Sequence, residues 1–109
     1  MIGKVLVVAA VAGLLGAGAA VAQQPDGAAL YARTCASCHG PQGTPTPAMA
    51  KAMTGIPDFG ARATSAVPDS VLRDAIMNGK GRMMAAYKAR LTPDQVTALI
   101  AYIRTLAKH

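Results

Sequence analysis

Three segments of the chain carry apolar residues at a helical spacing. The first covers about residues 26–36, starts at a Pro-Asp pair, and places Leu30, Tyr31 and Thr34 on one face. The second covers about residues 68–77, with Pro68 in its first turn and an Asn-Gly stop signal after it. Its apolar stripe consists of Leu72, Ala75 and Ile76.

The third segment has the clearest helix start in the chain. Thr92 is expected at the N-cap, Pro93 at the first helical position, and Gln95 three residues after the cap, where it completes a capping box. The apolar face that follows contains Val96, Leu99, Ile100, Ile103 and Leu106. Residues 42–66 are rich in Pro and Gly, which predicts loop with one short helical turn over about residues 48–53. No segment alternates apolar and polar residues as a strand does, so the predicted class is all-α, with three main helices.

The first 22 residues predict a signal peptide. Lys4 supplies a positive charge, an apolar run rich in Ala and Gly follows, and Ala20-Val21-Ala22 ends it with the small-x-small pattern of a cleavage site. The alternative is a retained membrane helix, since about 18 apolar residues can just span a bilayer. Both interpretations export the domain, which is expected over residues 23–109, to a compartment that permits oxidised thiols.

The exported part has few large side chains with which to build a core. It contains no Trp, one Phe and three Tyr. A domain this small buries a low fraction of its surface and usually needs a staple such as disulfides, a metal or a cofactor. Two cysteines can form one disulfide at most, so we expect another group to fill the interior.

Both cysteines and a histidine lie within the sequence Cys35-Ala36-Ser37-Cys38-His39. C-x-x-C-H is the haem c attachment signature, because two thiols one helical turn apart can reach the two vinyl groups of one haem. A thioredoxin-like C-x-x-C would need a βαβ context, and no strands are predicted here. A zinc site would need four ligands, and beyond Cys35, Cys38 and His39 only the terminal His109 is available as the fourth. The motif therefore predicts a covalent haem, which would also fill the interior.

The chain resembles small bacterial class I c-type cytochromes along nearly its whole length after the leader. The resemblance is carried by "DGAALYARTCASCHGPQG", "IMNGKGRMMAAYKARLT" and "PDQVTALIAYIRTLA". It implies a cytochrome c-like fold with loops wrapped around one haem c, bound through Cys35 and Cys38, with His39 on the iron. It also implies that the helix before the motif crosses the C-terminal helix closely. The positions that match this crossing are Gly27 and Tyr31 on one side and Leu99 and Tyr102 on the other.

The sixth iron ligand is expected from the non-helical segment after Asn78-Gly79. Similarity to the family pattern of Gly, two or three residues and then Met-Pro puts Met83 at the ligand position in "GKGRMMAAY" and Met84 where proline is usual. Met84 therefore stays open as the alternative. The family also uses a proline carbonyl to orient the histidine ligand, for which Pro45 and Pro47 are candidates.

The ligand set and the charge together predict the function. Iron held by His and Met has no open position, so we expect a periplasmic electron-transfer protein rather than an enzyme. The formal net charge is +6, which suits docking on acidic surfaces of redox partners. The basic residues gather at Arg73, Lys80, Arg82, Lys88 and Arg90.

The expected partners are a donor and an acceptor protein, such as a dehydrogenase, a cytochrome complex or an oxidase. We expect no binding to nucleic acid, and we expect association with a membrane only if the leader is retained. Two other interpretations remain open. One is a haem sensor or haem enzyme in which neither methionine stays bound, and the other is an electron-entry subunit of a larger dehydrogenase.

Overall fold

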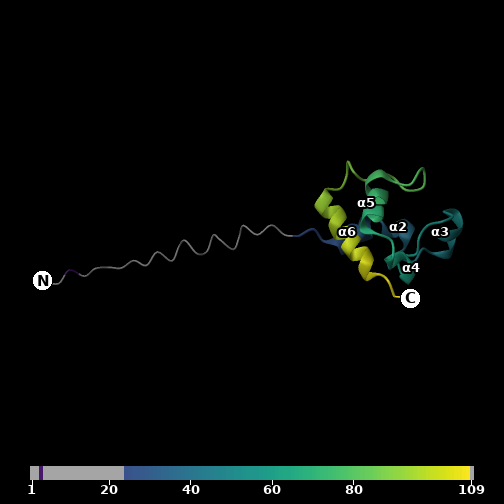
Figure 1. Ribbon diagram of the computed structural model, residues 1–109, viewed down its shortest axis with the longest axis horizontal. Coiled ribbons are helices and arrows are strands. Elements are labelled where there is room, and N and C mark those ends of the chain that lie inside the picture. Colours follow the sequence, from purple (N-terminus) through teal and green to yellow (C-terminus); the bar gives the residue numbers. More distant parts are fainter. Residues whose placement is uncertain (1–2, 4–23, 109) are drawn as a thin grey trace.

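The computed structural model describes Gly3 and residues 24–108, and the predicted signal peptide lies outside the described residues apart from Gly3. The described part is helical, and its single β-bridge joins Lys80 and Met84 (Figure 1). The helices are α1 (Gly27–Thr34), α2 (Ala36–His39), α3 (Pro47–Ala52), α4 (Arg62–Ser65), α5 (Asp69–Asn78) and α6 (Pro93–Thr105). In the part of the chain that the structure describes, no helix combines the length and the apolar character needed to cross a membrane.

The three predicted helices are confirmed, with one break. The first was expected to continue to Ala36, but α1 ends at Thr34 and α2 begins at Ala36. Cys35 is the C-cap of α1, with its N–H donating to the Tyr31 carbonyl at 2.8 Å, and it is also the N-cap of α2. The chain therefore turns at the first cysteine, and the rest of the motif forms a helical turn of its own.

Helices α1 and α6 cross at close range, as the resemblance implied. A Cβ atom on Gly27 would lie 2.9 Å from the carbonyl carbon of Ala98, so only glycine lets the two backbones approach this far. One turn along, the rings of Tyr31 and Tyr102 lie 5.2 Å apart between centroids. Helix α5 packs on α6. The buried apolar residues are Leu30, Tyr31, Phe59, Leu72, Ile76, Val96, Leu99, Ile100, Ile103 and Leu106.

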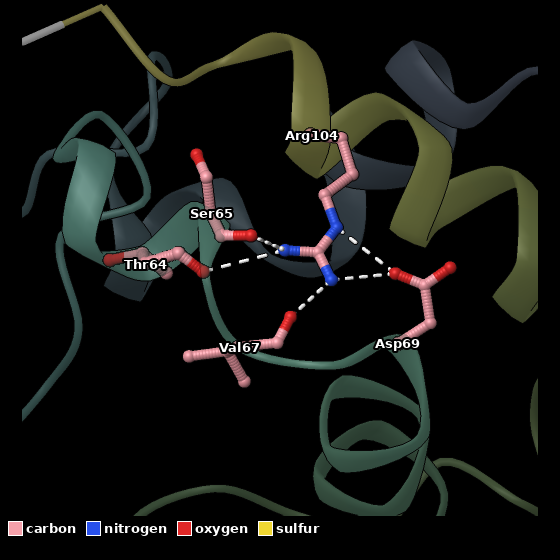
Figure 2. Close-up of polar contacts among 5 residues, drawn as sticks. All are labelled: Thr64, Ser65, Val67, Asp69 and Arg104. Carbon is pink, nitrogen blue, oxygen red and sulfur yellow. Dashed lines mark hydrogen bonds and ion pairs between the residues drawn. The ribbon is translucent and has the colours of Figure 1, made fainter.

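Arg104 near the end of α6 ties that helix to the end of α4, to the segment that follows it and to the start of α5 (Figure 2). Its Nε donates to the Asp69 carboxylate at 3.0 Å, and its Nη2 lies 2.6 Å from the same oxygen. Its Nη1 donates to the carbonyls of Ser65 at 3.2 Å and Thr64 at 3.4 Å, and its Nη2 also donates to the Val67 carbonyl. One guanidinium thus holds a segment in place that has few apolar residues of its own.

Candidate functional site

Cys35 is the residue that precedes α2, and Cys38 lies within the single turn of that helix. The Cys35 carbonyl accepts from the N–H groups of Cys38 at 3.3 Å and His39 at 2.9 Å, which closes the turn. Both thiols are free and half-buried, and they form no disulfide with each other. Burial, and secondarily the neighbouring Cys38 thiol, raises the pKa of the Cys35 thiol to about 11. The turn therefore presents two reduced thiols one helical turn apart, beside an imidazole.

The imidazole of His39 is held inside the protein. Its side chain is 8% exposed, and its Nδ1 atom is buried without a hydrogen bond of regular geometry to any described residue. Burial lowers the pKa of His39 because it disfavours the charged imidazolium, and the nearby Pro57 carbonyl opposes part of that shift. Burial therefore favours the neutral ring, which is the form that binds a metal.

The ring of Phe59 stacks on this imidazole. The two ring centroids are 4.6 Å apart and the planes differ by 19°. The backbone N–H of Phe59 donates to the Gly43 carbonyl at 2.9 Å, which ties the stacking residue to the loop that follows α2. Neither Phe59 nor Pro57 was identified from the sequence, where Pro45 and Pro47 were the candidates beside the histidine. The structure places the Pro57 carbonyl there instead.

The two methionines after α5 lie in a tight turn, in the segment between α5 and α6 (Figure 1). The turn is closed by Lys80 and Met84, whose backbones exchange hydrogen bonds of 2.9 Å and 3.4 Å. Met83 stands at its tip with 53% of its side chain exposed, whereas Met84 is half-buried and packs against the core. The expected non-helical conformation is confirmed, while the role of either sulfur stays a prediction.

The basic cluster of the sequence divides into two parts. Arg73 is engaged within the fold, since its guanidinium donates to Thr97 Oγ1 at 2.7 Å and to the Pro93 carbonyl at 3.4 Å, which links α5 to α6. The other four basic side chains are exposed around the segment that carries the methionines. We call them the basic rim: Lys80, Arg82, Lys88 and Arg90.

These residues fit a covalent haem. Two reduced thiols on one turn can form two thioethers, and the adjacent imidazole is buried and held by a stacked ring. The buried Nδ1 has no hydrogen bond of regular geometry among the described residues, and the stacked Phe59 ring is the contact that restrains the imidazole. Among the described residues, no three His, Cys, Asp or Glu side chains are arranged to hold a bare metal ion.

Comparison with known proteins agrees with this geometry. Residues 25–107 match the family model described as Cytochrome c. The chain is 35% identical over 82 residues to the Cbb3-type cytochrome c oxidase subunit FixP of Azorhizobium caulinodans, and the match covers 73% of this chain and 26% of that relative. A solved structure, the KustC0563 c-type cytochrome, superimposes with a TM-score of 0.69 and 33% identity, covering 76% of this chain and 99% of that one.

Proposed function

Because the chain belongs to the cytochrome c family, we propose that it is a periplasmic carrier that shuttles single electrons between redox partner proteins. Family membership implies a covalently bound haem c, and Cys35 and Cys38 stand in the spacing that attaches it. The observation that carries the proposal is the buried imidazole of His39 next to two free thiols. These three side chains would hold a redox group, which fits an electron carrier.

Each part of the site has a separate task in this proposal. When bound, haem c supplies the change between ferrous and ferric iron. The Cys35 and Cys38 sulfurs would anchor the group covalently and prevent its loss. His39 would offer a ring nitrogen to the iron, and the stacked ring of Phe59 restricts rotation of the imidazole.

We propose Met83 as the sixth ligand, from its place in the register after Gly79 and from its side chain, which is not engaged by the core. Met84 is the competing candidate, because it packs against the core and its backbone is held by the bridge to Lys80. A ligand methionine gives a characteristic sulfur-to-iron charge-transfer band in the ferric spectrum. We expect Met83→Leu to abolish that band and Met84→Leu to retain it. The reverse pattern would move the assignment to Met84.

The carrier is tested against a haem sensor or enzyme by ligand binding. The protein is exported with a haem c maturation system, and its ferrous form is mixed with carbon monoxide. We expect an alkaline pyridine haemochrome typical of thioether haem and no prompt change with carbon monoxide, because His39 and Met83 would both be bound to the iron. A prompt shift would mean a labile sixth position and would favour the sensor or enzyme. Absence of covalent haem would overturn both interpretations.

We further propose that the basic rim docks on acidic surfaces of the donor and the acceptor. The similarity to an oxidase subunit supports an oxidase or cytochrome complex among these partners. Association should slow steeply as ionic strength rises. Arg82→Gln should reduce both the rate and its salt dependence, whereas Arg62→Gln, the same charge change on α4, should alter them less. A flat salt dependence would remove the rim from docking.

A further inference from the structure

A polar groove of about 370 Å³ lies where the end of α1 meets the segment that leads into α6. Its lining does not include Cys35, Cys38, His39 or Met83, the residues assigned to the redox group. The groove is lined by Arg33, Thr34, Tyr87, Arg90, Leu91 and Gln95. Its residues come from three places in the chain: the last turn of α1, the segment before α6, and the first turn of α6.

Two contacts give the groove its shape. The guanidinium carbon of Arg90 sits 4.9 Å from the centre of the Tyr87 ring. The Tyr87 hydroxyl donates to the Thr34 carbonyl at 3.5 Å, which joins the segment before α6 to the end of α1. Arg90 is therefore held over a ring that is itself tied to the opposite wall.

Neither arginine of the groove has an anionic partner. Among the described residues, Arg33 and Arg90 form no ion pair, in contrast to Arg104 with Asp69. No carboxylate lines the groove, and Asp94, the acidic residue next to Gln95 in the sequence, is not part of its wall. Two positive charges thus meet one cavity, and no carboxylate of the described residues lines it.

The polar group of Gln95 adds a donor rather than an acceptor. Its Oε1 accepts from the backbone N–H of Thr92 at 2.9 Å in the capping box at the start of α6. Because the oxygen is engaged there, the amide nitrogen is the part of the side chain left for a ligand. The groove therefore offers two guanidinium groups and one amide donor, which is a set that selects a ligand rich in acceptor oxygens.

We propose that this groove binds a small multivalent oxyanion of the phosphate type, held by Arg33, Arg90 and the Gln95 amide. A guanidinium presents its donors in a planar fork that matches the oxygens of such an anion. The site borders Thr34, the residue before Cys35, so a bound anion lies beside the covalent attachment point. Its negative charge favours the oxidised form of the bound group, so binding lowers the reduction potential.

The test uses the haem-loaded protein labelled with ¹⁵N and titrated with pyrophosphate, with sodium chloride adjusted to keep the ionic strength constant. The titration is followed by ¹H–¹⁵N NMR spectra. We expect saturable chemical-shift changes confined to backbone amides around the groove. Arg90→Gln should weaken binding about tenfold or more, since it removes a charge-assisted hydrogen bond. Arg90→Lys, which keeps the charge but loses the fork, should give an intermediate affinity.

Arg62→Gln is the matched control, because Arg62 is exposed on α4 and outside the groove. It should bind pyrophosphate like the unchanged protein. Equal weakening in Arg62→Gln, or shifts spread over all basic residues, would overturn the site in favour of general charge screening. The potential is measured with and without pyrophosphate, and binding without any change in it would overturn the redox coupling alone. The titration requires no electron-transfer partner, so its failure and a failure of the proposed function are distinguishable.

Discussion

Substitutions at Arg104 and Asp69 can separate the stability contributed by a surface ion pair from that contributed by hydrogen bonds to backbone carbonyls. The side chain is 28% exposed, whereas its ionic partner Asp69 is 70% exposed. The carbonyl groups of Thr64 and Val67, which also accept from the guanidinium, are partly buried. Arg104→Met removes all of these bonds but keeps most of the apolar stem, whereas Asp69→Asn removes the ion pair and the negative charge at the start of α5 and leaves the bonds to the carbonyls in place.

The two variants should differ clearly in cost. An exposed ion pair is worth about 0.2–1 kcal/mol, and Asp69 adds a favourable charge of about 0.3–1 kcal/mol at the N-terminus of α5. Asp69→Asn should therefore lower the free energy of unfolding by about 1 kcal/mol. Each hydrogen bond to a carbonyl contributes about 1 kcal/mol, and the two partly buried carbonyls would lose their donor. We expect Arg104→Met to cost about 2–3 kcal/mol.

The measurement is guanidinium chloride unfolding of the ferric holoprotein, followed by far-UV circular dichroism. If the slope of the free energy of unfolding against denaturant concentration is unchanged, a shift in the midpoint reports a change in stability. Unfolding in urea at low and high salt separates the contributions, because salt screens the exposed pair and leaves the carbonyl bonds largely unaffected. Equal costs for the two variants would refute the reasoning, since they would mean that the ion pair accounts for the stabilisation.

Three further substitutions test the packing around the site. Gly27→Ala should destabilise by about 1–3 kcal/mol, because the new methyl group meets the backbone of α6, which cannot rotate away; denaturant unfolding that matched the unchanged protein would show that the helices separate freely. Tyr31→Phe should cost about 1–3 kcal/mol by the same assay, since it leaves the buried Gly40 carbonyl without the 2.7 Å bond from the phenol, and an unchanged midpoint would contradict this. Phe59→Leu should change the ferric electron paramagnetic resonance g values and the potential by freeing the His39 ring, whereas Phe59→Tyr should preserve both. If Leu and Tyr gave the same spectrum, the stacked ring would have no orienting role.

The features that the sequence predicted are those encoded by neighbouring residues. The amphipathic helices follow from a spacing of three or four residues, and the capping box at Thr92 needs only Gln95 three positions on. The C-x-x-C-H motif is equally local. Helix α4 was not predicted because the sequence Arg-Ala-Thr-Ser has no apolar stripe. It is ordered from outside by Arg104 and by the Thr64 hydroxyl, which donates to the Asp58 carbonyl at 2.6 Å.

The residues around His39 were not predicted from the sequence either, because they are not its neighbours along the chain. Phe59 follows His39 by some twenty positions of irregular chain, and no periodicity indicates which residue of that segment folds back. Arg73 lies near the other four basic residues in the sequence and was grouped with them on that ground. The structure engages it between α5 and α6 instead, through Thr97.

The end of α6 supports the histidine through residues that the sequence keeps far apart. A Cβ atom on Gly43 would lie 2.9 Å from Phe59 Cβ and 3.1 Å from Leu106 Cδ1, so the loop after α2, the stacking residue and the end of α6 are in close contact. The backbone N–H of Lys108 donates to the carbonyl of Gly60 at 2.8 Å, which ties the chain after α6 to the residue that follows Phe59. Helix α6 packs on α1, which leads directly into α2 and the histidine, and Leu106 at its end lies against the loop that is in contact with Phe59. The geometry of the imidazole therefore depends on the packing of the whole domain rather than on the motif alone.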